Sequence, residues 1–348
     1  MRLLAGRSQT FEHANFALLG KYNKLGAIHV NSSTAAMCAG QHRVNGAPVV
    51  FKTTAAGTPW TSVLTEILFL ERCQHPGLAH LLDVFGSYSI CTLVFKHHGD
   101  RLMPHQDWPA WDRVYKMHLL LQLAEAIAYM HSLNVAHTDI QSEHVLLDCD
   151  MNGAKQVVLC GFRRCVLMNL SPPDWQSRKK WGYLPPEAIF NKPTADGAED
   201  TWSWGVFAFL LGTRHRLMPL RIGDDIQARM AAIFGPPLLA DMVELQAMPG
   251  YFGIQGASEC ADFDWQQMAQ DHMGEEFTRA LSGVFCWAPS RSSAKQIYVF
   301  SRGVPMPLHT CRGSGIHHHA NTCLHYMHLV VHILNDRGVP GFQRSRPS

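Results

Sequence analysis

The sequence has little net charge, and this absence limits what the chain can bind. Thirty Lys and Arg residues against twenty-eight Asp and Glu residues leave a net charge of +2 over 348 residues. No overall electrostatic field therefore favours a nucleic acid or a membrane surface. Hydrophobic residues make up 47% of the chain, which is enough to bury a full core in one large domain or two lobes.

Long hydrophobic runs are also missing. The best apolar run, Gly205 to Leu211, is too short to cross a bilayer. The first residues, Met1 to Arg7, contain too few apolar side chains for a signal peptide. We therefore expect an intracellular protein, either cytoplasmic or nuclear, that does not enter a membrane.

Closely spaced cysteine pairs are absent as well. The ten cysteines include no C-x-x-C pair and form no dense framework; they are Cys38, Cys73, Cys91, Cys149, Cys160, Cys165, Cys260, Cys286, Cys311 and Cys323. This pattern favours free thiols, mostly buried, in a reducing compartment.

The hydrophobic pattern changes near residue 100. Before it, short apolar runs such as Gly26–Val30 and Pro48–Lys52 alternate with turn residues and predict antiparallel strands. Helical spacing predicts one helix over Thr61–Cys73, ended by the proline and glycine that follow His75. From about residue 110 the pattern is mainly helical, beginning with Trp111–Ser132. A β-rich part thus precedes a helix-rich part.

Histidine and cysteine are frequent after residue 302. They are Cys311, His317, His318, His319, Cys323, His325 and His328. These are zinc ligands, but their spacing fits no finger pattern, so we interpret the segment as a partly ordered tail with a short helix over Leu324–Leu334. A metal-binding interaction tail is the alternative.

The segment Val135–Leu147 resembles the catalytic loop of protein kinases, H-R-D-L-K-P-E-N-[VI]-L-L. The resemblance implies that Asp139 is the residue that orients a substrate hydroxyl and accepts its proton. Gln141 stands where the family has a lysine that neutralises the phosphoryl group, and His144 replaces an asparagine that binds magnesium. Thr138 replaces an arginine.

Further segments follow the kinase order. Val49–Lys52 resembles V-A-I-K, which implies that Lys52 grips the α and β phosphates of ATP and pairs with Glu66 on the helix. Gly26 is what remains of the glycine-rich loop, since Ala27–Asn31 supplies side chains where the family expects glycines.

Leu93–Asp100 resembles the hinge between the lobes. The resemblance implies that Phe95 guards the back of the nucleotide pocket. The backbone of Lys96, His97 and His98 would then face adenine.

The helix-rich part carries three more matches. Gly182–Glu187 resembles the end of the activation segment, Asp200–Gly205 the D-x-W-S-x-G helix start, and Trp287–Ala294 a motif whose Arg291 would pair with Glu187. His137, Phe162 and Leu70 would pack between the lobes. The Leu-Val-Phe hinge and Ile233–Pro237 resemble the cyclin-dependent and MAP-kinase branch.

Together the motifs imply an α+β, two-lobed protein kinase-like fold. We predict an N-terminal extension over 1–14, a kinase-like domain over 15–301 and a tail over 302–348. Within the domain the β-rich N-lobe covers about 15–95, the hinge 96–100 and the helical C-lobe 101–301.

The sequence departs from the family at the magnesium site. Gly161 stands where the D-F-G motif has its metal-binding aspartate, so with His144 no recognisable metal ligand remains. Asp148 or Asp150 is the alternative ligand. Lys180 replaces a threonine that usually holds the catalytic aspartate.

These replacements predict a catalytically impaired pseudokinase. It would act as a regulatory or scaffolding module that binds another protein, with weak or metal-independent ATP binding at Lys52 and no magnesium. The alternative is an atypical ATP-dependent Ser/Thr kinase that uses Asp139 to phosphorylate protein hydroxyls. Neither reading indicates an oligomeric state.

Overall fold

The structure of the protein is a computed structural model, and it describes part of the chain. The described residues are 20–28, 35–86, 90–102, 111–149, 154–168, 181–190, 197–218, 225–237, 239–251 and 263–287. The chain divides into two units, Met1–Val304 and Pro305–Ser348, and all described residues belong to the first. The predictions made for Asp150, Lys180, Arg291, the N-terminal extension and the tail lie outside the described residues, and the predicted domain boundaries stay predictions.

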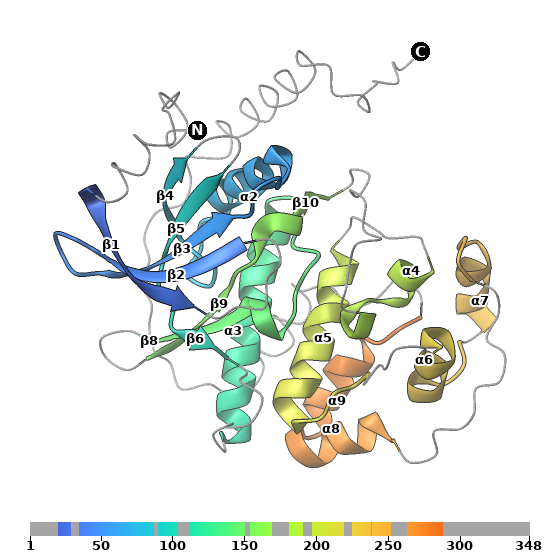
Figure 1. Ribbon diagram of the computed structural model, residues 1–348. Coiled ribbons are helices and arrows are strands. Elements are labelled where there is room, and N and C mark those ends of the chain that lie inside the picture. The colour runs from blue at the N-terminus through green and yellow to red at the C-terminus, as the bar shows by residue number, and fades with distance from the viewer. Residues whose placement is uncertain are drawn as a thin grey trace. The chain divides into compact units, whose positions relative to one another are not determined.

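A five-stranded antiparallel sheet forms the first part of the unit (Figure 1). Its strand order is β1-β2-β3-β5-β4. The bounds are β1 Tyr22–Ile28, β2 Ala35–His42, β3 Pro48–Thr54, β4 Leu81–Gly86 and β5 Cys91–Lys96. The predicted Pro48–Lys52 strand is therefore the first five residues of β3, which is the central strand of the sheet.

One helix, α2 (Trp60–Arg72), packs on this sheet. It starts after Pro59 and ends where the N–H of Cys73 donates to the carbonyl of Phe69, so the predicted bounds were correct to one residue. Its buried face carries Ile67 and Leu70 together with Glu66. Burying a carboxylate on an apolar helix face requires a partner, and here that partner is Lys52 on β3.

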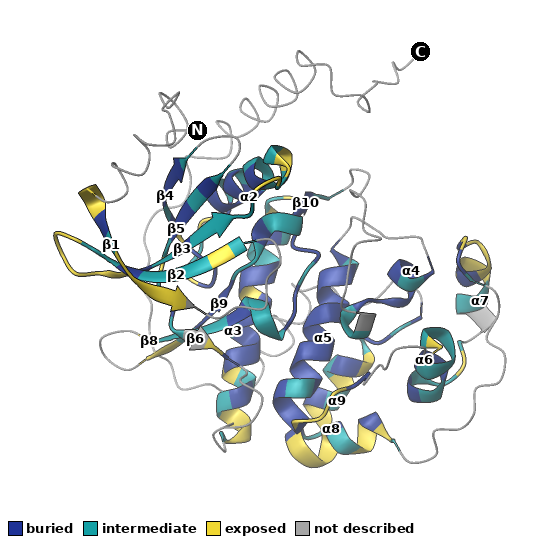
Figure 2. Cartoon of the chain, viewed as in Figure 1, coloured by how far each residue is buried: buried dark blue, intermediate teal, exposed yellow. Residues whose placement is uncertain are grey.

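The second part is mainly helical. Its helices are α3 Arg113–Ser132, α4 Pro186–Ile189, α5 Ala198–Thr213, α6 Ile226–Phe234, α7 Leu239–Gln246, α8 Trp265–Met273 and α9 Glu275–Ser282. Asp112 begins α3 by accepting a 2.7 Å hydrogen bond from the N–H of Tyr115. Figure 2 shows α5 buried along almost its whole length, as expected for the central helix of a lobe.

Short strands and turns hold the loop segments between the two parts. β7 (Val135–Ala136) pairs with β10 (Val166–Leu167), and β8 (Val145–Cys149) lies between β6 (Asp100–Arg101) and β9 (Lys155–Leu159). Three 3-10 turns complete the path: η1 Ser142–His144, η2 Phe162–Arg164 and η3 Trp181–Tyr183. The segment resembling a catalytic loop therefore runs from β7 through η1 to β8.

The sheet carries its own small core, separate from the main one. It consists of Tyr22, Val49, Phe51, Phe85 and Val94. The Tyr22 hydroxyl donates to Asp83 Oδ2 at 2.5 Å, which fixes β1 to β4 across the sheet. The main core runs continuously through α2, α3 and α5.

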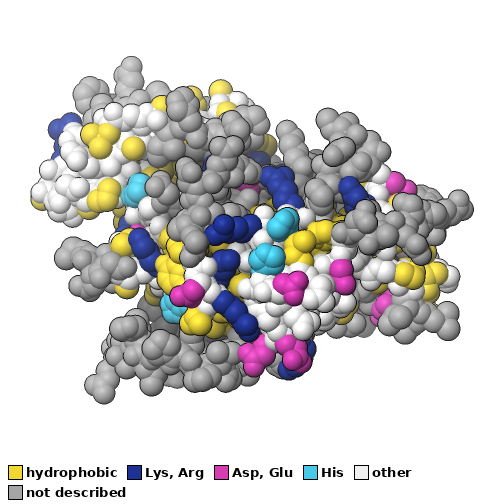
Figure 3. Space-filling view, turned by 90° about the horizontal axis from the view of Figure 1, so that it is seen from below, with side chains coloured by type: hydrophobic (Ala, Val, Ile, Leu, Met, Phe, Trp, Pro, Cys, Tyr) yellow, Lys and Arg dark blue, Asp and Glu magenta, His cyan; other side chains and the backbone are white. Residues whose placement is uncertain are grey.

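These elements confirm the predicted α+β, two-lobed fold. The described cysteines are thiols and not disulfides, and three of them, Cys73, Cys91 and Cys165, are buried. None of the helices in the described ranges is both long and apolar enough to cross a bilayer. Figure 3 shows acidic and basic side chains interspersed on the face drawn, in keeping with the small net charge.

Gly40 on β2 offers a test of the sheet's core. A Cβ at this position would lie 2.1 Å from Cε2 of the Phe51 ring and 2.6 Å from the Asn23 carbonyl. We expect Gly40→Ala to lower the free energy of unfolding by about 1–3 kcal/mol, because the ring is fully buried and cannot move aside. Urea denaturation measures the change.

Gly26→Ala on β1 is the matched control, since a Cβ there meets nothing within 4 Å. An equal loss of stability in both variants would show that Phe51 does not set the cost.

Candidate active site

The loop after β7 is held by one buried carboxylate. Asp200, in the first turn of α5, accepts 2.7 Å hydrogen bonds from the N–H groups of His137 and Thr138 and a 2.9 Å bond from Nε2 of His131. Burial by itself would raise the pKa of Asp200, but the hydrogen bonds from His131 and His137 hold this pKa below its ordinary value. The carboxylate is therefore charged and fixes the start of the loop.

Thr138 joins the loop to η2. Its φ of 58° places a β-branched residue in the left-handed region, a strained conformation that must be held by neighbouring bonds. Its Oγ1 donates a 2.6 Å hydrogen bond to the carbonyl of Arg164. The residue that replaces the family's arginine thus positions the backbone of a different arginine.

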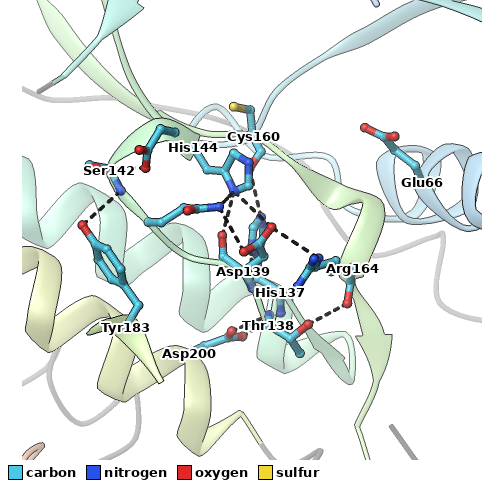
Figure 4. Close-up of polar contacts among 12 residues, drawn as sticks. Glu66, His137, Thr138, Asp139, Ser142, His144, Cys160, Arg164, Tyr183 and Asp200 are labelled. Carbon is cyan, nitrogen blue, oxygen red and sulfur yellow. Dashed lines mark hydrogen bonds and ion pairs between the residues drawn. The ribbon is translucent and has the colours of Figure 1, made fainter. Parts of the chain in front are cut away.

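Asp139 lies among three donor side chains, as Figure 4 shows. Its Oδ1 accepts from Nε2 of Gln141 at 3.0 Å. Its Oδ2 is 3.6 Å from Nδ1 of His144 and 3.8 Å from Nε of Arg164. The three predicted residues of the loop are therefore brought together.

Sequence reasoning missed Arg164. The signal was present, because two arginines follow Phe162 directly, at the place where the family's D-F-G motif ends. Their importance was not evident since only the folded chain brings η2 beside Asp139.

Gln141 is buried, and its Oε1 has no hydrogen-bond partner among the residues that the structure describes. An unsatisfied buried acceptor costs roughly 1–3 kcal/mol. The side chain is held by its Nε2, which donates a hydrogen bond to Asp139 Oδ1. Gln141 therefore contributes a hydrogen bond to the site but no positive charge.

The ring of His144 fills the space into which a side chain at position 161 would extend. Nδ1 of His144 donates a 2.7 Å hydrogen bond to the carbonyl of Asp139, which fixes the ring. A Cβ built on Gly161 would lie 2.7 Å from Cγ of that ring and 2.8 Å from Cδ2 and Cε1. The imidazole therefore stands where a side chain at position 161 would begin, and neither residue offers a carboxylate or amide oxygen to a cation.

Lys52 on β3 and Glu66 on α2 form the predicted ion pair. Nζ of Lys52 lies 2.5 Å from Oε1 and 2.7 Å from Oε2 of Glu66. Glu66 is almost wholly buried, and Lys52 satisfies its carboxylate. The pair is confirmed, whereas the role of Lys52 in phosphate binding stays a prediction.

Gly26 lies just after a register shift in the pairing of β1 with β2. Such an irregularity in a strand is a common place for glycine. Of the segment predicted to crowd the phosphates, Ala27–Asn31, the residues from His29 onward lie outside the described residues. The role of Gly26 stays a prediction.

The hinge segment continues from β5. Phe95 pairs with Val50 on the neighbouring strand and packs against the main core. The N–H of Lys96 donates to the His80 carbonyl at 3.0 Å, and that of His97 to the Pro48 carbonyl at 3.2 Å. The prediction that the backbone of Lys96, His97 and His98 faces adenine stays a prediction.

Asp148 is tied to the hinge. Its Oδ2 lies 3.0 Å from Nζ of Lys96 and 3.0 Å from Nδ1 of His98. The suggestion that Asp148 could replace the missing metal ligand stays a prediction. Within the described ranges, no three His, Cys, Asp or Glu side chains are arranged to hold a metal ion.

His137 packs as predicted against Phe162, with ring centroids 5.5 Å apart, and Leu70 is fully buried in the same core. Nε2 of His137 donates to the Cys160 carbonyl at 3.0 Å, and Nδ1 accepts from the N–H of Asp139 at 3.3 Å. Burial lowers the pKa of His137. The ring is therefore a neutral structural element.

Stability should depend on pH through this ring. An unfolded histidine titrates near about 6.5, whereas burial lowers the pKa of His137, and of His98, in the folded protein. Below about pH 6.5 the unfolded chain takes up protons that the folded protein does not, so the free energy of unfolding should fall as pH decreases.

Urea denaturation at about pH 7.5 and about pH 5.5 measures this fall. His137→Phe, which keeps a ring against Phe162, should show a smaller fall than the parent. An unchanged pH dependence in that variant would mean that His137 is not the titrating group.

Comparisons with known proteins agree with the motifs. Residues 33–298 match a family model described as the protein kinase domain. The chain is 22% identical to a PAS domain-containing serine/threonine-protein kinase of Mus musculus over 54% of this chain and 13% of the relative. It is 26% identical to a serine/threonine-protein kinase of Caenorhabditis elegans over 65% of this chain and 32% of the relative.

A third relative, named a probable cell division protein kinase of Encephalitozoon cuniculi, is 24% identical over 61% of this chain and 78% of its own length. The chain thus spans less than a third of the two relatives named first. These names come from several kinds of kinase, so the cyclin-dependent and MAP-kinase branch stays a prediction.

The family model covers more than half of the chain and includes the ion pair, the loop and the helix that anchors it, so this chain belongs to the protein kinase domain family.

Proposed function

We propose that this kinase domain is catalytically impaired and acts by binding another protein, as a regulatory or scaffolding module. The observation that supports it best is the packing of His144 against Gly161. Phosphoryl transfer depends on positioning the phosphates and neutralising their charge, usually through magnesium. The two positions that would supply magnesium ligands here carry an imidazole and no side chain at all.

These residues do not fit magnesium. The ion prefers hard oxygen ligands in octahedral geometry. His144 presents a nitrogen, and its ring blocks any larger side chain at position 161. Asp148 is held at the hinge by Lys96 and His98. We therefore infer weak nucleotide binding that does not require a divalent metal.

Asp139 then serves as an anchor for the loop. A catalytic base needs an oxygen directed at the substrate hydroxyl. In this site one oxygen accepts from Gln141, and the other faces His144 and Arg164. The carboxylate stabilises these three side chains, which gives a reason for its presence without catalysis.

The alternative is an atypical Ser/Thr kinase that uses Asp139 as base and Lys52 to hold phosphates. It is favoured by the intact Lys52–Glu66 pair and by the anchoring of the loop on Asp200. Both features would also serve a protein-binding module, since the pair fixes α2 on the sheet in one lobe and Asp200 fixes the loop in the other.

Thermal unfolding with ATP separates the two proposals. For the impaired module we expect a small rise in Tm with ATP, equal in EDTA and in magnesium or manganese, because His144 and Gly161 offer the ion no carboxylate or amide oxygen. A rise that requires metal would contradict the proposal.

A phosphotransfer assay on the parent and Asp139→Asn is the matching control for catalysis. Phosphate transfer that disappears in the variant would establish the alternative.

The packing of His144 on Gly161 predicts non-additive substitutions. Gly161 has a φ of +91°, which strains any side chain placed there, and the clash with the His144 ring adds a second cost to Gly161→Asp. We expect a loss of about 2 kcal/mol in the single variant. The loss should be about 1 kcal/mol smaller when His144→Asn removes the ring.

Urea denaturation of the two single variants and the double variant measures this coupling. The double variant should also gain a metal-dependent rise in Tm with ATP, since it carries both oxygen ligands. Additive losses of stability would mean that the ring does not exclude a side chain at position 161.

A further inference from the structure

We propose that Arg164 acts with Lys52 as a phosphate-binding residue, so that a nucleotide's phosphate chain is held by two side-chain cations in place of a metal ion. The inference rests on the proposed metal-independent binding and assigns the residue responsible for it. Neither motif resemblance nor family membership points to Arg164.

Arg164 supplies a positive charge at a site where the family's basic residues are replaced by neutral ones. Gln141 occupies the position of the family's lysine and is neutral, and Thr138 occupies the position of an arginine. The guanidinium group of Arg164 points toward the Asp139 carboxylate (Figure 4). It therefore supplies positive charge beside Asp139 from η2, a different segment of the chain.

The backbone of Arg164 is fixed, which limits where its side chain can reach. Its carbonyl accepts the 2.6 Å hydrogen bond from Thr138 Oγ1, and Thr138 is itself held by Asp200. The preceding Phe162 is buried against His137. Arg164 thus starts from a rigid turn next to the loop, as a binding residue requires.

A phosphate can compete with Asp139 for the guanidinium group of Arg164. At 3.8 Å, Nε of Arg164 and Oδ2 of Asp139 are an ion pair beyond hydrogen-bond distance. Both side chains remain about a quarter exposed. A guanidinium group matches the geometry of phosphate oxygens, and a phosphate carries more charge than a carboxylate.

Lys52 and Arg164 are held by neighbouring elements. Lys52 pairs with Glu66 on α2, and α2 packs against η2, which carries Arg164. A phosphate chain bound at this junction would meet Lys52 on the side of α2 and Arg164 on the side of Asp139.

Asp139 then has a definite effect on binding. Its carboxylate repels a phosphate and also competes for Arg164. Removing the charge of Asp139 should therefore strengthen binding, whereas removing the charge of Arg164 should weaken it. A purely structural role for Arg164 would not produce these opposite signs.

The test measures the Kd of ATP, and of inorganic tripolyphosphate, by calorimetry in EDTA on the full chain. We expect Arg164→Gln to weaken both ligands about tenfold, and Arg164→Lys to weaken them less. Asp139→Asn should tighten both about threefold. Arg163→Gln, which removes the same charge from the neighbouring residue of η2, is the control and should change either Kd by less than about threefold.

Circular dichroism and Tm establish that each variant is folded. If Arg164→Gln does not fold, Arg164→Lys and Asp139→Asn still test the proposal. Metal-free binding that is unchanged in Arg164→Gln, or weakened in Asp139→Asn, overturns the assignment of Arg164 but leaves metal-independent binding in place. Binding by the parent only when magnesium is present overturns both.

Discussion

The buried carboxylate of Asp200 is the interaction on which the rest of the site depends. It sits in the first turn of α5, where the helix dipole favours a negative charge, and it accepts from two successive backbone N–H groups of the loop and from His131. Through Thr138 this anchor extends to Arg164, and through His137 it extends to Phe162. One charge thereby sets the positions of the loop and of η2, the two segments that form the candidate site.

Two departures from the kinase pattern, at positions 144 and 161, are coupled in the structure. The loss of a carboxylate at position 161 and the gain of an imidazole at position 144 look independent along the chain. In the fold the ring packs on the glycine, so each residue explains why the other is tolerated. A cavity where the aspartate would have stood would cost stability, and the imidazole fills it. The site is therefore well packed around a side chain that does not suit magnesium.

The features of the kinase pattern that this chain retains stabilise the fold, whereas the replaced ones lie at the candidate site. The Lys52–Glu66 pair joins the sheet to α2, and His137 packs against Phe162 of the main core, so both contacts stabilise the fold. The replaced positions lie around Asp139, where phosphate and metal would be handled. Arg164 is an addition and not a loss, because it gives the site a cation that the motif positions lack. The function proposed above would combine a rigid surface for a protein partner with an anion held by side chains alone.

The sequence by itself determined the fold class, the α2 helix to within one residue, the Lys52–Glu66 pair and the absence of a carboxylate at position 161. These follow from local periodicity and from motifs whose order and spacing are read along the chain. Tertiary structure alone decided the packing of His144 on Gly161, the approach of Arg164 to Asp139 and the binding of Asp148 to Lys96 and His98 at the hinge. Each of these depends on backbone angles and side-chain directions that bring separate segments together, and no local pattern in the sequence encodes such contacts.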